Sequence, residues 1–176
     1  MLALFFYLQF LLKSTNQHGV HSPFVYNFVT KCLYNNQLIP KKELKHFSAT
    51  LSNLQVHLLL KIIRYFSAYH ILTDDISIKN LSNIDTCCCI STSNSRDTFD
   101  LIFVNHPNEN ADLRDYLPVL HNDSILVINN IHQKEKELLW QQLIADERVT
   151  AYVDVYVQGY VFVRKEQGKE GFYIRP

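Results

Sequence analysis

The sequence predicts one α/β unit: an open, mostly parallel β-sheet with a helical N-terminal cap and a C-terminal β-hairpin. Three observations predict it. Apolar residues recur at helical spacing through the first third of the 176-residue chain. Short runs that are apolar on both faces then alternate with helical patterns, as buried parallel strands and their crossover helices do. Near the end, two β-like runs lie close together and predict the hairpin.

Residues 1–67 are expected to form the helical cap. The run Leu2–Leu12 is strongly apolar, but it is shorter than the roughly 20 residues that cross a bilayer. We therefore expect no membrane span, and a helix that packs on the protein's own core or on a partner. Ser22-Pro23 predicts a helix start, with serine as N-cap and proline at the first helical position. A later helix, Leu54–Phe66, has one broad apolar stripe.

Residues 68–176 are expected to form a shortened sheet domain, in one compact unit with the cap. The strand candidates are His70–Thr73, Ile84–Ile90, Phe99–Asn105, Ser124–Asn130 and Phe172–Arg175. The helix candidates between them are Asp112–Leu120 and Gln133–Ala145. The hairpin is expected to join Val149–Val157 to Tyr160–Arg164 through a turn at Gln158-Gly159.

Charge and cysteine content limit the binding partners and the cellular compartment that we expect for this protein. Seventeen basic and seventeen acidic residues give a formally neutral chain, so nucleic acid and anionic membranes are not expected partners. Of the four cysteines, three are contiguous at Cys87–Cys89. This pattern does not resemble a secreted disulfide framework, and a reducing, cytoplasmic compartment fits it better. Because strand residues alternate between faces, we expect Cys87–Cys89 to be buried strand residues rather than metal ligands.

The residues that follow the parallel strands are the candidate site, because ligands of open α/β sheets bind outside the carboxyl ends of the strands. They are Asp74, Asp75, Asn105, Asn129, Asn130 and His132. No glycine occurs between Val20 and Gln158. A Walker loop and a Gly-rich dinucleotide loop are therefore both absent.

Three segments carry a resemblance to a known family: Lys13–Val25, with the string KSTNQHGVHSPFV; His121–Ser124 with Ile131-His132; and Gly159–Gln167. On these segments the chain resembles class I S-adenosylmethionine-dependent methyltransferases of an O-methyltransferase-like type common in Bacteroidetes. The resemblance implies a Rossmann-like sheet of seven strands whose last two form a hairpin. It also implies S-adenosylmethionine as cofactor and a small-molecule oxygen or nitrogen acceptor as substrate. No metal is expected.

The middle of the chain departs from this family. In the family, the first strand leads into an acidic, glycine-containing loop around the methionine end of the cofactor; here His70-Ile71-Leu72 leads into Thr73-Asp74-Asp75, with no glycine. A βαβ unit takes about 30 residues, so the segment between Ile71 and Phe99 has room for about one unit where the family has about three. We therefore expect a weakened or lost cofactor site.

The chemistry of the acceptor side is also reduced. The resemblance implies an aspartate after the fourth family strand and an aspartate pair after the fifth, but Asn105 and Asn129-Asn130 stand there. An amide brings no charge to a metal and cannot act as a general base. His132 could still take a proton, although a solvated histidine at the start of the next helix is an equal alternative. Asp74 and Asp75 are a remnant of the cofactor site or, the favoured interpretation, an acidic cap of a short helix.

The sequence therefore predicts a truncated, degenerate methyltransferase relative with impaired or lost methyl transfer. If it is active, we expect Asp74 or Asp75 near the cofactor. Asn105, Asn129, Asn130 and His132 would lie near the acceptor. The alternative is a non-catalytic interaction protein that self-associates or docks to an intact relative. The loss of strands would expose a sheet edge and apolar helix faces, and such surfaces favour association.

Overall fold

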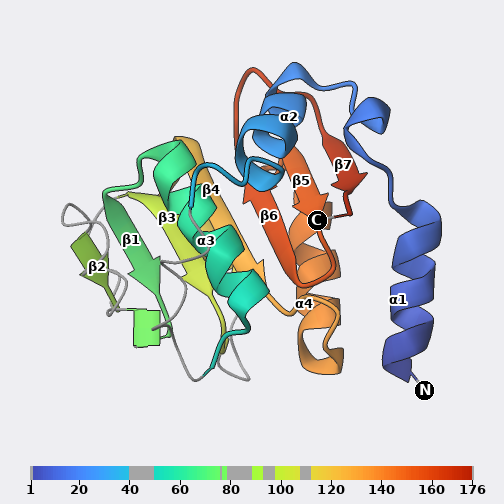
Figure 1. The fold of residues 1–176 in the computed structure, drawn as a ribbon. Helices are drawn as coiled ribbons and strands as arrows, with labels where there is room; N and C mark the ends of the chain where they lie inside the picture. The colour runs from blue at the N-terminus through green and yellow to red at the C-terminus, as the bar shows by residue number, and fades with distance from the viewer. Residues whose placement is uncertain are drawn as a thin grey trace.

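A computed structural model describes residues 2–39, 50–75, 77–78, 89–92, 98–107 and 112–175. This part of the chain forms one sheet of seven strands in the order β2-β1-β3-β4-β6-β5-β7 (Figure 1). The strands are β1 His70–Thr73, β2 Cys89–Ser91, β3 Phe99–Val104, β4 Leu120–Asn129, β5 Ala151–Asp154, β6 Gln158–Phe162 and β7 Glu170–Tyr173.

The pairing of the strands confirms the predicted fold class. Strands β2, β1, β3 and β4 are parallel, whereas β6 is antiparallel to both β4 and β5. Between β1 and β3 the described chain contributes one strand, β2, to the sheet, as the length of that segment predicts. The last strand, β7, runs parallel to β5 and forms the opposite edge. The result is an open Rossmann-like sheet with a helical N-terminal cap and a C-terminal hairpin.

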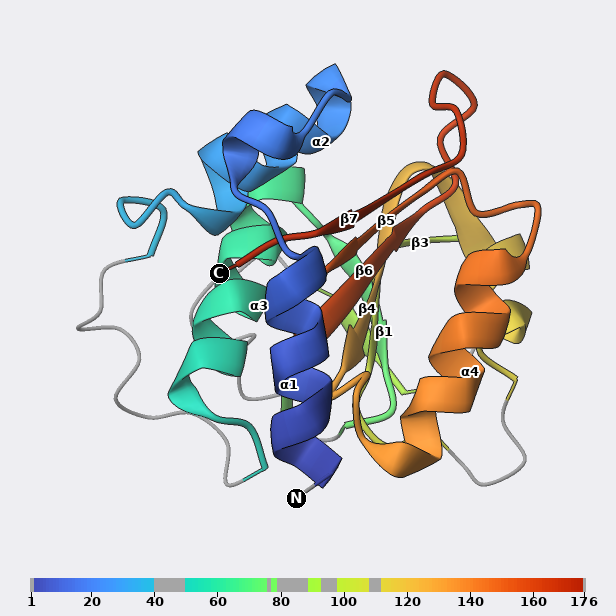
Figure 2. The same ribbon diagram turned by 90° about the vertical axis from the view of Figure 1, so that its right-hand side faces the viewer.

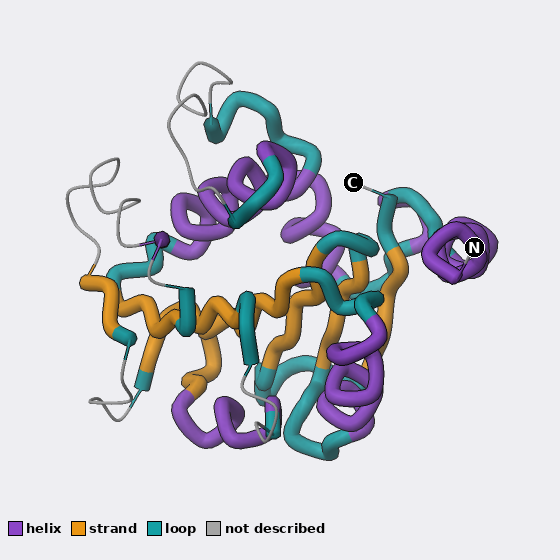
Figure 3. The backbone as a smooth tube through the Cα atoms, turned by 90° about the horizontal axis from the view of Figure 1, so that it is seen from below, coloured by secondary structure: helices purple, strands orange, loops and turns teal. Residues whose placement is uncertain are grey.

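Helices cover both faces of the sheet (Figure 3). The α-helices in the described residues are α1 Leu2–Lys13, α2 Pro23–Asn27, α3 Asn53–Phe66 and α4 Lys134–Ala145. A π-helix, Phe28–Leu33, continues α2, and 3₁₀ segments span Gln17–Gly19 and Leu113–Val119. In Figure 2, α3 lies on one side of the sheet and α4 on the other, while α1 lies at the β7 end. None of the helices in these described ranges is long and apolar enough to cross a membrane.

Local capping explains where α2 and α3 begin. The hydroxyl of Ser22 accepts a hydrogen bond from the backbone N–H of Val25, and Pro23 occupies the first helical position, which confirms the predicted start. Ser52 and Gln55 form a capping box at the start of α3, since each side chain accepts a bond from the other residue's backbone N–H. The division into residues 1–67 and 68–176 stays a prediction.

Two apolar layers enclose the sheet. Because side chains alternate along β3, Leu101 and Phe103 join the layer under α2 and α3, whereas Ile102 and Val104 join the layer under α4. Both layers exclude water from the central strands, which explains why β3 and β4 read as continuous apolar runs.

The hairpin turn differs from the prediction. Gln158 and Gly159 lie inside β6 rather than in the turn. The turn uses Tyr156, whose φ of 67° is left-handed and whose N–H donates to Asp154 Oδ1 at 2.7 Å. A Cβ on Gly159 would lie 2.7 Å from the ring of Trp140. Glycine is therefore needed there for close packing and not for a turn.

The prediction that the cysteines are buried is wrong for Cys89. This residue is exposed, because β2 is the edge strand of the sheet. Cys87 and Cys88 lie outside the described residues.

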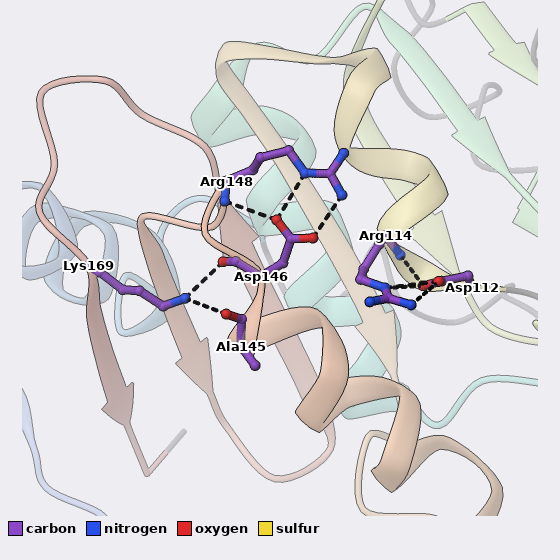
Figure 4. Close-up of polar contacts among 6 residues, drawn as sticks. All are labelled: Asp112, Arg114, Ala145, Asp146, Arg148 and Lys169. Atoms are coloured by element: carbon purple, nitrogen blue, oxygen red, sulfur yellow. Dashed lines mark hydrogen bonds and ion pairs between the residues drawn. The ribbon is translucent and has the colours of Figure 1, made fainter.

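Local polar contacts close the C-terminal end of α4 (Figure 4). The ammonium of Lys169 donates to the carbonyl oxygens of Ala145 at 2.9 Å and Asp146 at 2.8 Å. The guanidinium of Arg148 donates to both carboxylate oxygens of Asp146, and this hydrogen bonding lowers the pKa of Asp146 to about 2. The two bonds from Lys169 satisfy carbonyl groups that a helix end leaves unpaired.

The two ends of the described chain are also tied together. Thr15 forms a parallel bridge with Ile174, just beyond β7. The N–H of Thr15 donates to the carbonyl of Tyr173 at 2.8 Å. This bridge holds the segment after α1 against the edge of the sheet.

Candidate functional site

The structure brings together four of the residues singled out from the sequence. Asp74 and Asp75 follow β1, Asn105 follows β3, and Asn129 is the last residue of β4. The Asn105 side-chain amide donates to Asp75 Oδ2 at 2.7 Å, and its oxygen accepts from Asn129 Nδ2 at 2.8 Å. The carboxyl ends of three strands are thus joined by side-chain hydrogen bonds. We call Asp74, Asp75, Asn105, Asn129 and Lys136 the carboxyl-edge network.

Asp75 is a structural cap. It is buried, and its carboxylate accepts from the N–H and hydroxyl of Ser77, from Thr50 Oγ1 and from Asn105. Burial alone would raise the pKa of Asp75, but these hydrogen bonds, led by those from Ser77 and Asn105, hold the pKa below its ordinary value. The bond to the Ser77 N–H at 2.9 Å caps the turn that follows. The acid-cap interpretation therefore fits Asp75.

Asp74 ties two loops together. Its carboxylate accepts from the backbone N–H groups of Asn105 at 2.7 Å and His106 at 2.8 Å. Desolvation by the surrounding protein raises the pKa of Asp74 and outweighs the lowering effect of these two bonds. Asp74 thus fixes the loop after β3 against the end of β1.

Lys136 completes the network, and the sequence analysis missed it. This side chain, in the first turns of α4, is 7% exposed. Its ammonium donates to the carbonyl oxygens of Asn105 at 2.5 Å and Asn129 at 2.9 Å. Burial lowers the pKa of Lys136, and the charge of Asp74 opposes that shift. The available signal was spacing: Lys136 stands four and seven residues before Trp140 and Leu143, on the buried stripe of α4.

The two asparagines at the end of β4 have different surroundings. Asn129 is fully buried, and its Oδ1 has no hydrogen-bond partner among the residues that the structure describes. Asn130 has a left-handed backbone, with φ of 55°, and its side-chain oxygen accepts from Gln55 Nε2 at 2.6 Å. Asn130 therefore holds the start of α3 to the end of β4, away from the amide of Asn105.

His132 lies apart from the amides. Its Nε2 contacts Asp154 Oδ2 at 2.8 Å, and its ring stacks on Tyr156 with centroids 5.0 Å apart. Phe10 of α1 packs edge-on against the same ring. The side chain is 15% exposed, so the interpretation of His132 as a solvated histidine is wrong. Its partner is the last residue of β5, and no contact in the described part of the chain joins it to Asn105 or Asn129.

A small cavity adjoins Asp74. It has a volume of about 220 Å³ and lies at the ends of β1 and β3. Its walls include Leu72, Asp74, Thr92 and Tyr116. Ligand pockets commonly measure about 300–1,000 Å³, so the described walls enclose too little space for a nucleoside joined to an amino acid. Within the described ranges, no three His, Cys, Asp or Glu side chains are grouped as metal ligands would be.

Comparisons with known proteins give weak similarity to solved structures alone. No family model matches the chain, and no curated protein matches it. Among solved structures, one described as a candidate O-methyltransferase from Klebsiella pneumoniae is 15% identical, with a TM-score of 0.46. The match covers 78% of this chain and 95% of that one. A similarity of this size identifies neither a cofactor nor a substrate.

Proposed function

We propose that the chain is a methyltransferase-like protein in which methyl transfer from S-adenosylmethionine to a small oxygen or nitrogen acceptor is impaired or lost. The observation that carries the proposal is the closed carboxyl-edge network. Its polar side chains bond to one another and to backbone groups. Apart from Asn129 Oδ1, which has no partner among the described residues, the groups of this network are already bonded and are not free to bind a ligand.

The cofactor side supports this proposal. The resemblance implies acids after the first and second strands that hold the methionine and ribose ends of the cofactor. Here Asp74 holds the loop after β3 and Asp75 caps the turn at Ser77. The sequence 91–96 after β2, STSNSR, contains no acid. The adjoining cavity of about 220 Å³ is also smaller than ordinary ligand pockets.

The acceptor side supports it as well. A general base must reach the proton that it removes. The amides of Asn105 and Asn129 have no basic atom, and His132 is paired with Asp154. The ammonium of Lys136 donates hydrogen bonds to two carbonyl oxygens. Lys136 and His132 are thus engaged within the protein, whereas His106 is exposed and its Nε2 lies 3.0 Å from the side-chain nitrogen of Asn105.

A thermal-unfolding titration tests the proposal. A ligand that binds only the folded state stabilises it by about 2.7 kcal/mol at 100 times its Kd. We expect no shift in Tm with millimolar S-adenosylmethionine or S-adenosylhomocysteine, under conditions where an active class I methyltransferase shifts clearly. A saturable shift that Asp74→Asn abolishes would contradict the proposal and place the cofactor beside Asp74.

We propose self-association, or docking to an intact relative, as a second candidate function. Helix α1 favours it, because Tyr7, Leu8 and Leu12 are exposed there, Leu12 at 87%. Apolar side chains gathered on one exposed helix are typical of association surfaces. We expect light scattering to give a mass that rises with concentration and falls to the monomer value in Leu8→Glu/Leu12→Glu. A wild-type mass that stays monomeric at every concentration would exclude self-association.

A further inference from the structure

A second buried lysine lies far from the carboxyl-edge network, on the helical face of the molecule. Lys61 of α3 is 2% exposed and lines a cavity of about 410 Å³. The cavity lies between α3, the end of the π-helix and the segment after β7. We call it the α3 cavity. Its walls combine basic side chains with leucines: Lys61, Arg175, His57, Leu33, Leu54 and Leu58.

The charge of Lys61 has no counter-charge in the described chain. Its ammonium donates to the carbonyl oxygen of Leu33 at 2.7 Å and to Asn36 Oδ1 at 3.0 Å, and both acceptors are neutral. Among the described residues, the titratable group that acts on it is Cys32, and burial raises the pKa of that thiol to about 12. Cys32 is therefore uncharged near neutral pH.

The end of the π-helix offsets only part of this charge. Leu33 is the last residue of that helix, and a helix C-terminus carries about half a negative charge. A buried ammonium is costly unless a full opposite charge accompanies it. The cavity beside Lys61 is the place where such a charge can enter.

Arg175 adds a second cation to the same cavity. Its Nε and Nη2 donate to the hydroxyl and carbonyl oxygens of Ser14 at 3.0 and 3.1 Å, which leaves other guanidinium N–H groups for a ligand. The Tyr34 hydroxyl donates to the backbone oxygen of Arg175 at 2.8 Å and fixes the position of this residue. Arg175 is exposed, so it lies where a ligand would enter.

We propose that the α3 cavity binds a small organic carboxylate that carries an apolar body. The carboxylate would lie between Lys61 and Arg175, and the apolar body would pack on Leu33, Leu54 and Leu58. A planar carboxylate fits the guanidinium fork, and the three leucines favour a ligand with an apolar part over an ion that has none. The cavity volume of about 410 Å³ lies within the range of ordinary ligand pockets. This inference does not depend on the proposed function.

The test is a titration of the full chain with octanoate, followed by calorimetry and by the methyl resonances of labelled leucines. We expect saturable shifts at Leu33, Leu54 and Leu58. Lys61→Met should weaken octanoate at least tenfold, and Arg175→Gln several-fold. The matched control is Lys31→Met, because Lys31 is an exposed lysine of the π-helix that does not line the cavity. It should bind like the wild type.

Two comparison ligands test the two halves of the proposal. Octan-1-ol has the apolar body without the charge, and inorganic phosphate has charge without the body; neither should bind. The proposal is overturned if octanoate gives no saturable shift or if octanol matches it. It is likewise overturned if phosphate, or an octyl phosphate ester, binds more tightly. If Lys61→Met does not fold, an unchanged affinity in Arg175→Gln, at an exposed site, would overturn it.

Discussion

Lys136 and Lys61 are both buried lysines whose ammonium groups donate to backbone carbonyl oxygens. Burial lowers the pKa of each. They differ in what opposes that shift: the charge of Asp74 acts on Lys136, whereas among the described groups it is the thiol of Cys32 that acts on Lys61. The comparison teaches that a buried cation beside an acid can close a surface, whereas the one with no acid among the described residues lines the α3 cavity that we propose as a binding site.

Replacing each lysine by methionine should lower the free energy of unfolding by different amounts. Lys136→Met leaves the carbonyls of Asn105 and Asn129 unpaired in a buried place, and we expect it to lower the free energy of unfolding by about 3 kcal/mol. Lys61→Met also removes the donor to the Leu33 carbonyl, but it relieves a buried charge that has no counter-charge among the described residues, so the change should stay within about 1 kcal/mol of wild type. Urea unfolding near neutral pH measures both.

Lys31→Met serves as the control for this pair, since an exposed lysine should contribute less than about 0.5 kcal/mol. Equal losses in Lys136→Met and Lys61→Met would show that the two sites do not differ in the way we describe.

A change of charge inside the carboxyl-edge network should have the next largest effect. Asn105→Asp replaces a donor to Asp75 with a second carboxylate, where the present bond is 2.7 Å long. We expect a loss of about 2 kcal/mol at neutral pH, because two close carboxylates repel each other and a hydrogen bond is removed. The loss should shrink as the pH falls and one of the acids becomes protonated.

Asn122→Asp is the matched control, because Asn122 also donates to an acid, Glu166, but in an exposed position. Water screens that pair, so its cost should stay below about 0.5 kcal/mol. If both substitutions cost the same, the carboxyl edge is as solvated as the surface.

The smallest expected effect is on how stability depends on pH in acid. The pKa of Asp75 is lowered in the folded protein, because its hydrogen bonds outweigh burial. Its stabilising contribution is therefore present above the ordinary aspartate pKa of about 3.9 and is lost as the pH falls through the lower folded value. Asp75→Asn should flatten this part of the stability curve between about pH 5 and about pH 2, measured by urea unfolding. An unchanged slope would contradict the assigned role of Asp75.

Asp74 should behave with the opposite sign. Desolvation raises its pKa in the folded protein, so ionised Asp74 weakens the fold at neutral pH and protonation relieves that cost as the pH falls. Asp74→Asn should therefore steepen the acid limb that Asp75→Asn flattens. If the two substitutions change the acid limb of the stability curve in opposite directions, these adjacent acids have opposite pKa shifts in the folded protein.

The sheet could be predicted from sequence because its signals are local. Strand β1 matches its predicted bounds, and α4 differs by one residue. Apolar runs without alternation require helices on both faces, and the structure has them. The predicted last strand is also present as β7, although its pairing with β5 and the bridge to Thr15 depend on contacts that no local pattern encodes.

The candidate site was less predictable. The rule that strand ends converge placed Asp75, Asn105 and Asn129 together. It could not tell whether these groups would face a ligand or each other, because that depends on side-chain partners from other elements. Lys136 and Lys61 were missed since each stands within an apolar helical stripe, where a lysine is ordinarily expected to reach solvent.

The bridge between Thr15 and Ile174 has a consequence for biosynthesis. The segment that follows α1 leaves the ribosome early, but the backbone groups that it pairs with belong to residues made more than a hundred codons later. Helix α1 therefore has no docking site during most of translation. Its apolar side chains therefore stay accessible until β7 has been made.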